Sequence, residues 1–163
     1  MIMGYSFNER SIKNIRTTNR ILQELAAKVI ARSVFDFGVL DEGGFRTAEE
    51  QNEIFRAGHS KCDGYEKRSF HQTGLAIDFV PYINGDYTWK NNEASLQIAK
   101  IALEEFQHIF TEDYYLHWGG FWGANDLDGD GKLESTDKLG WDKVHFELRK
   151  YPQEWGVYPI LWA

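Results

Sequence analysis

The sequence predicts an α+β fold in which helices flank a small, mostly antiparallel sheet. Segments with helical spacing of apolar residues are mixed with short segments of strand-like alternation, and they follow no regular strand–helix–strand order. The 163 residues, 42% of them hydrophobic, suffice for a sizeable core. No linker or repeat divides the chain, so residues 1–163 are expected to form a single domain.

The N-terminal third predicts two helices with a strand between them. Residues 12–35 carry apolar side chains at helical spacing, and residues 35–40 alternate loosely, as a strand does. Thr47 with Glu50 three positions later forms a capping box, so we expect a short helix that starts there and stops at Gly58.

The rest of the chain predicts one more helix and three more strands. Residues 75–80 alternate between two faces, and Asp78 lies on one of these faces. Residues 93–110 repeat apolar side chains at helical spacing. Residues 114–118 and 143–148 are expected to be strands, which completes a small sheet.

Composition narrows the class of partner. The net charge of −7 argues against nucleic acid, because phosphate binding requires clustered Lys and Arg. No apolar run approaches the roughly 20 residues of a membrane span, and the start of the chain lacks the apolar core of a signal peptide. We therefore expect a protein that is made in the cytoplasm and does not contact a membrane. We also expect it to be a monomer. Cys62 is the single cysteine, which excludes an internal disulfide.

Three potential metal ligands and one spare carboxylate stand out. His71 and Asp78 flank Gly74, and Asp142 shortly precedes His145. Two imidazoles and a carboxylate suit zinc, and a further carboxylate can take a proton from water that the metal activates. Asp142 and His145 would point apart on a straight strand, so we expect a turn or bulge between them. Residue types alone leave an alternative open, since a histidine near a strand is usually structural or solvated.

The spacing of these residues resembles a known family of zinc peptidases. The family is that of the zinc D-alanyl-D-alanine carboxypeptidases, which includes the vancomycin-resistance D,D-dipeptidases and the L-alanyl-D-glutamate endopeptidase endolysins of bacteriophages. The matching motifs are Ser69-x-His71-x-x-Gly74-x-Ala76-x-Asp78, Asp142-x-x-His145-Phe146-Glu147, and Gly44-Phe45-Arg46-Thr47 with Gln51. The stretch from Asp78 to Gly85, followed by Trp89, is similar to the phage endolysin branch in particular.

The resemblance implies a role for each matching residue. His71, Asp78 and His145 match the zinc ligands, and Asp142 matches the catalytic acid and base. Arg46 matches a residue that holds and polarises substrate, and a guanidinium is suited to that task. The implied fold is that of the LAS metallopeptidases, which is hedgehog-like, with the zinc site on the sheet.

Two further polar residues are candidates for substrate binding. Gln51 could hydrogen-bond substrate, and support of Arg46 is an equal alternative. Ser69 could shape the pocket, and capping of a turn is an equal alternative.

A second metal signal is independent of the family. Residues 126–137 fit the spacing of a calcium-binding loop inserted into the domain, with a glycine at the sixth position for the sharp turn. The predicted ligands are Asp126, Asp128, Asp130, the backbone carbonyl of Lys132, Glu134 and Asp137. The alternative is an acidic, solvated turn. Because the loop ends just before Asp142, we expect calcium to order the active site.

The expected function is zinc-dependent, calcium-modulated hydrolysis of the L-alanyl-D-glutamate bond in the peptidoglycan stem peptide. The protein would be an endolysin that lyses the host cell, made in the host cytoplasm and released to the wall through a holin-made breach. A D-alanyl-D-alanine carboxypeptidase or dipeptidase would use the same site. A non-catalytic module that binds wall peptide through a structural metal is a further alternative.

Overall fold

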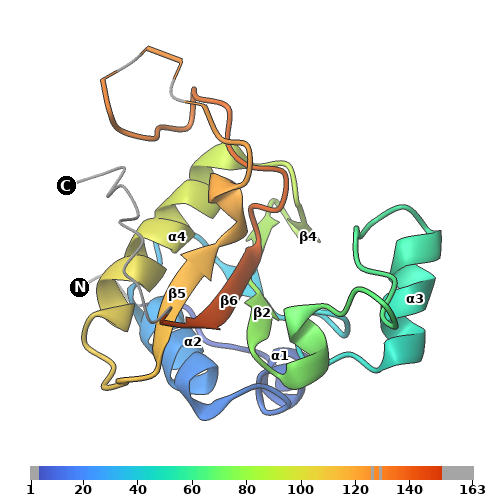
Figure 1. The fold of residues 1–163 in the computed structure, drawn as a ribbon. Helices are drawn as coiled ribbons and strands as arrows, with labels where there is room; N and C mark the ends of the chain where they lie inside the picture. Colours follow the sequence, from blue (N-terminus) through green and yellow to red (C-terminus); the bar gives the residue numbers. More distant parts are fainter. Residues whose placement is uncertain (1–3, 126, 129, 152–163) are drawn as a thin grey trace.

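The structure is a computed structural model that describes residues 4–125, 127–128 and 130–151. Helices and antiparallel strands form an α+β fold (Figure 1). The helices are α1 (Glu9–Ile15), α2 (Arg20–Arg32), α3 (Ala48–Arg56) and α4 (Asn92–Phe106), with short 3-10 helices η1 (Phe70–Thr73) and η2 (Gly119–Phe121). The strands are β1 (Phe37–Gly38), β2 (Ala76–Asp78), β3 (Val80–Ile83), β4 (Asp86–Tyr87), β5 (Tyr114–Trp118) and β6 (His145–Lys150).

The strands form two antiparallel sheets, where the sequence predicted one. The order is β2-β6-β5 in one sheet and β1-β3-β4 in the other. The predicted strand over residues 75–80 divides between the two sheets at Phe79, whose N–H donates to the carbonyl of Val144. The prediction of an α+β fold with antiparallel pairing is confirmed, and the single strand over 75–80 is wrong.

The helix predicted over residues 12–35 is divided into two helices in the structure. Residues 12–35 overlap the second part of α1 and contain the whole of α2, and residues 16–19 separate the two helices. Asn19 ends the continuity because its side chain accepts a hydrogen bond from Ile21 N and caps α2, while its own N–H donates to Gly74 O at 2.8 Å. That second bond joins segments far apart in sequence, so helical spacing could not reveal the break.

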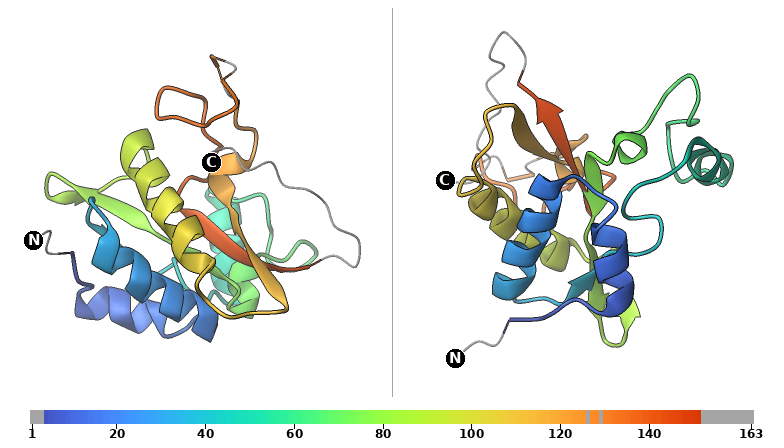
Figure 2. Two further views of the ribbon diagram at one scale, coloured as in Figure 1. Left: turned by 90° about the vertical axis from the view of Figure 1, so that its left-hand side faces the viewer. Right: turned by 90° about the horizontal axis from the view of Figure 1, so that it is seen from below.

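The short helix α3 follows its prediction. Thr47 and Glu50 form both hydrogen bonds of a capping box. The chain leaves the helix at Gly58, whose φ of 80° lies in the left-handed region. Figure 2 shows α3 and the chain that follows it standing apart from the other helices.

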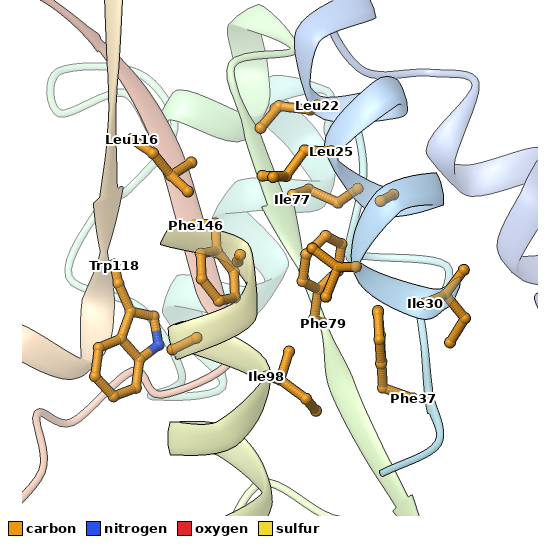
Figure 3. Close-up of a cluster of buried hydrophobic side chains, with 14 of the residues drawn as sticks. Leu22, Leu25, Ile30, Phe37, Ile77, Phe79, Ile98, Leu116, Trp118 and Phe146 are labelled. Atoms are coloured by element: carbon orange, nitrogen blue, oxygen red, sulfur yellow. The ribbon is translucent and has the colours of Figure 1, made fainter. Parts of the chain in front are cut away.

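The core lies between the β2-β6-β5 sheet and the pair of helices α2 and α4. Figure 3 shows the buried side chains that fill it, with the rings of Phe79 and Phe146 at its centre, 5.0 Å between centroids. Leu22 and Leu25 of α2 and Ile98 of α4 are almost completely buried against them. Burial of each such side chain contributes about 1.5–3 kcal/mol. The sheet is thereby fixed on its helix-facing side, and its other side carries the site.

The segment between η2 and β6 projects from the body and returns to it (Figure 1). Asn125 and Lys138 pair as an isolated bridge at the base of this projection. Gly140 N donates to Gly120 O at 2.6 Å, and a side chain on Gly140 would collide with the backbone of Gly119. Close backbone approach therefore joins the projecting segment to the sheet.

Candidate metal centre

Three predicted ligands from separate parts of the sequence meet at one end of the sheet. Asp78 of β2 lies directly opposite His145 of β6 in the antiparallel register. His71 belongs to η1, which ends at Gly74 with a φ of 71° before β2 begins. The left-handed glycine turns the chain, so that His71 reaches the Asp78–His145 pair. The zinc-ligand set predicted from the motifs is thus brought together in space.

The donor atoms of this triad form a nearly equilateral triangle. His71 Nε2 and His145 Nδ1 are 3.1 Å apart, and they lie 3.2 and 3.1 Å from Asp78 Oδ1. A tetrahedral zinc ion with bonds of about 2.0–2.1 Å separates its ligand atoms by about 3.3–3.4 Å. The triangle therefore fits three ligands of one ion, and the chemistry of the donor set suits zinc.

Each imidazole is oriented by a second hydrogen bond on its other nitrogen. His71 Nδ1 donates to the carbonyl of Gly44 at 2.7 Å, and His145 Nε2 donates to Glu147 Oε2 at 2.8 Å. These partners leave Nε2 of His71 and Nδ1 of His145 for a metal. Glu147 is part of the matching motif Asp142-x-x-His145-Phe146-Glu147, but the resemblance implies no role for it. The signal that could have found it is the His-x-Glu spacing on a strand.

Burial and pairing act against each other in the pKa values of the triad. Burial of His145 would lower its pKa, but hydrogen bonds to Asp78 and Glu147 outweigh this effect and raise the pKa to about 10. Burial of Asp78 would raise its pKa, but His71, His145 and Arg46 hold it well below the usual range. Burial lowers the pKa of His71. Without metal, the site thus keeps an anionic Asp78 beside a protonated His145.

Arg46 contacts the triad directly. Its Nη2 donates to Asp78 Oδ2 at 3.0 Å, on the carboxylate oxygen that does not face the histidines. Nη1 donates to Gln51 Oε1 at 3.1 Å, and Nε donates to the carbonyl of Glu42. Gln51 is fully buried, and this geometry favours the alternative in which it supports Arg46. A contact between Gln51 and substrate stays a prediction.

Ser69 starts η1. Its hydroxyl accepts a hydrogen bond from His71 N, and Gln72 completes a capping box by accepting from Ser69 N at 2.9 Å. The geometry therefore gives Ser69 the capping role, which fixes the backbone of His71. Its side chain also lines the cavity around the triad, so a contact with substrate stays a prediction.

Asp142 approaches the triad through a turn, as predicted. His145 N donates to Asp142 O at 3.3 Å, and Trp118 Nε1 holds the turn by donating to Lys143 O at 2.7 Å. Burial, followed by the negative charge of Asp78, raises the pKa of Asp142 to about 6. A carboxyl group with that pKa can accept a proton and return it near neutral pH.

A cavity of about 1050 Å³ contains the triad, Arg46 and Asp142 in its lining. Trp122 and Trp141 stack at its edge with centroids 5.1 Å apart, and the Trp122 ring lies 5.3 Å from the His145 ring. Trp141 is half exposed. The site is therefore open to a peptide-sized ligand and flanked by aromatic rings.

The predicted calcium ligands are only partly described. Asp126 lies outside the described residues. The side chains of Asp128, Asp130 and Asp137 accept hydrogen bonds from backbone amides within the loop, and Asp137 is buried. Among the described residues of the loop, no three carboxylate groups have oxygen atoms within 4.8 Å of one another. The donor atoms of the triad do lie within that distance. Calcium binding stays a prediction.

Comparisons with known proteins identify relatives along nearly the whole chain. The family described as phage L-alanyl-D-glutamate peptidase matches residues 3–149. The chain is 31% identical to the L-alanyl-D-glutamate peptidase of Escherichia phage T5, over 90% of this chain and 99% of that protein. It also matches the crystal structure of the Serratia marcescens L-Ala D-Glu endopeptidase ChiX, with a TM-score of 0.61, 28% identity, and coverage of 88% of this chain and 90% of that one. These matches confirm the kinship inferred from the motifs, and the chain belongs to the phage L-alanyl-D-glutamate peptidase family.

Proposed function

We propose that this protein is a zinc-dependent peptidoglycan peptidase that hydrolyses the L-alanyl-D-glutamate bond of the stem peptide. One observation carries the proposal: the donor triangle of His71, Asp78 and His145 shares a cavity with Asp142, whose pKa is raised to about 6. Membership of the phage peptidase family supplies the bond. A metal triad alone would fit many hydrolases, and the additional poised carboxylate is what favours proton transfer.

Zinc held by the triad would supply a Lewis acid that activates water and polarises a carbonyl group. Asp142 accepts a proton from the attacking water and passes it to the leaving amine of D-glutamate. Arg46 stabilises negative charge on the carbonyl oxygen, since its guanidinium is oriented by Gln51 and Asp78. Gln51 and Ser69 act by orienting Arg46 and His71.

The finer features of the fold and of the lytic role belong to the same proposal. The residues form one domain with a hedgehog-like arrangement, in which Asp78 and His145 sit on neighbouring strands. The protein acts as a monomer and reaches the wall from the host cytoplasm after a holin-type breach. No helix in the described part of the chain is long and apolar enough to cross a membrane.

Calcium modulation is supported by the way the loop connects to the site. Asn125 pairs with Lys138 at the base of the loop, and Trp141 N donates to Trp122 O at 3.3 Å nearer the sheet. Trp122 in turn packs near the ring of His145. A cation that closes the acidic loop would reduce repulsion between its carboxylates and stabilise this connection. Calcium therefore orders the turn that carries Asp142.

The test is digestion of purified sacculi, followed by mass spectrometry of the released muropeptides. The zinc-loaded protein should create new N-terminal D-glutamate, and calcium should increase the rate. Loss of terminal D-alanine instead would identify a D-alanyl-D-alanine carboxypeptidase or dipeptidase. Binding to sacculi without any cleavage product would identify a non-catalytic wall-binding module and would overturn the proposal.

A further inference from the structure

The cations in the cavity lining differ in whether they have an anionic partner. The lining contains Arg10, Arg46, Lys61, Lys67, Arg68 and Arg149. Three of these are paired: Arg10 with Asp41, Arg46 with Asp78, and Arg149 with Glu147. The other three form no ion pair with any described residue, and all three belong to the segment of residues 57–69, which we call the α3–η1 loop. One wall of the cavity therefore carries three uncompensated positive charges.

The α3–η1 loop is held in a defined shape by three amide side chains, two of them buried and one half-buried. Its backbone and Ser60 accept hydrogen bonds of 2.8–2.9 Å from Gln51 (to Ser60 Oγ and Cys62 O), Asn52 (to Asp63 O) and Gln72 (to Gly64 O). Gly64 has a φ of 88°, and a Cβ there would lie 2.6 Å from Ala48 O. Because the loop backbone is fixed, it presents its cations to the cavity with little further ordering cost.

The acidic residues of the same loop do not line the cavity. Asp63 directs its carboxylate to the backbone N–H groups of Tyr65 and Lys67, each at 2.9 Å. Glu66 is exposed and lies outside the lining. On the cavity side, Lys61 places its ammonium 4.9 Å from the ring centroid of Trp141, next to Asp142 in sequence. Lys61 thus lies close to the segment that carries the proposed proton-transfer residue.

We propose that Lys61, Lys67 and Arg68 bind the free carboxylate of the D-glutamyl residue in the substrate, an inference that rests on the proposed function. Glutamate has two carboxyl groups and the peptide continues through only one, so the other is an anion at neutral pH. That anion is only a few bonds from the amide that is cleaved. In a chain of net charge −7, a local positive wall offsets repulsion of an acidic substrate and selects it over a neutral analogue.

The experiment compares two soluble muropeptides that differ in one group. Both are disaccharide-peptides with L-alanine followed by D-glutamate, and in the second the free glutamate carboxylate is a carboxamide. We expect the zinc-loaded wild type to show a kcat/KM at least about tenfold higher on the carboxylate, as befits hydrogen bonds to a charged group. This preference should be lost in the double variant Lys67→Ala, Arg68→Ala, and separately in Lys61→Ala. In each case kcat/KM should fall on the carboxylate substrate and stay unchanged on the carboxamide.

Two controls make the outcomes distinct. Arg68→Lys keeps the charge and should retain most of the preference, while Arg56→Ala removes an exposed cation of α3 outside the cavity lining and should change nothing. Equal cleavage of both muropeptides by the wild type would overturn the inference and leave the peptidase function intact. A preference that survives the α3–η1 loop variants would overturn the assignment to these residues. Cleavage of neither muropeptide would overturn the proposed function itself.

Discussion

Glu147 accepts a hydrogen bond of 2.8 Å from His145 Nε2, on the opposite side of the imidazole from Asp78. His145 and Glu147 lie two positions apart on β6, so their side chains share one face of the strand and the carboxylate meets the ring. Arg149, the next residue on that face, donates from Nε to the other Glu147 oxygen. His145 is therefore held in the tautomer that presents Nδ1 to a metal.

Removal of this carboxylate should weaken metal binding. We expect Glu147→Ala to lower zinc affinity about 10- to 100-fold, because the imidazole loses the partner that fixes its orientation. Competition with a chromophoric zinc chelator measures the affinity directly, without reference to activity. Glu112→Gln removes an exposed carboxylate near the start of β5 and serves as the control. Equal zinc affinities for wild type and Glu147→Ala would contradict the orienting role.

Zinc binding should release a proton from the site. Hydrogen bonds to Asp78 and Glu147 raise the pKa of His145 to about 10 against the effect of burial, so His145 is protonated at pH 7 in the metal-free protein. A metal can bind Nδ1 only after that proton leaves. We expect release of about one proton per zinc at pH 7, and affinity that rises with pH below about 10. Titration calorimetry in buffers of different ionisation enthalpy counts the proton, and a count near zero would refute the assignment.

Asp142 should be needed for turnover and dispensable for zinc binding. Asp142→Asn keeps the shape of the side chain but cannot accept a proton, so we expect kcat to fall about 10²- to 10⁴-fold. The pKa of Asp142 is raised to about 6 by burial and Asp78, and a bound cation would lower it. Wild-type activity should therefore rise with pH along a limb at about pH 6 or below, and the residual activity of the variant should lack that limb. An unchanged pH profile in Asp142→Asn would exclude it as the base.

Calcium should affect the protein through residues 126–137. With zinc present, we expect added calcium to raise the melting temperature and activity of the wild type, and the double variant Asp128→Ala, Asp130→Ala to lose both responses. Asp113→Asn, which removes an exposed carboxylate just before β5, is the matched control. Activity and melting temperature of the wild type that do not respond to calcium would reject the modulation.

Local signals were the part of this structure that the sequence could predict. The capping box of Thr47 and Glu50 involves neighbours in the chain, and the turn between Asp142 and His145 follows from their spacing on a strand. The break between α1 and α2 was missed because it depends on a bond from Asn19 to Gly74, which only the folded chain brings together.

In the site, too, the sequence motifs predicted some features, and others depend on contacts that only the folded chain makes. The motifs predicted the triad of His71, Asp78 and His145, because they contain two imidazoles and a carboxylate, which are all potential metal ligands. The function of Glu147 was not foreseen, since a glutamate on a strand is usually solvated and its burial beside His145 is a property of the packed sheet.

His117 should make folding stability sensitive to acid. It is buried on β5 opposite Glu147 in the register, and burial, together with the positive charge of Arg149, lowers its pKa to about 4. The unfolded chain, in which histidine has a pKa of about 6.5, takes up a proton before the folded chain does, so stability falls as pH drops. Between pH 7 and pH 5 this residue should contribute about 2 kcal/mol of the loss.

The measurement is urea unfolding of wild type and His117→Gln at both pH values. The variant cannot take up that proton, so its loss of stability between pH 7 and pH 5 should be smaller than that of the wild type by about the same 2 kcal/mol. The absolute stability of His117→Gln at pH 7 does not enter this comparison, because packing changes at the site affect both pH values alike. Equal losses of stability in the two proteins would show that His117 takes up its proton as readily in the folded state as in the unfolded chain. That result would refute the lowered pKa assigned to its burial.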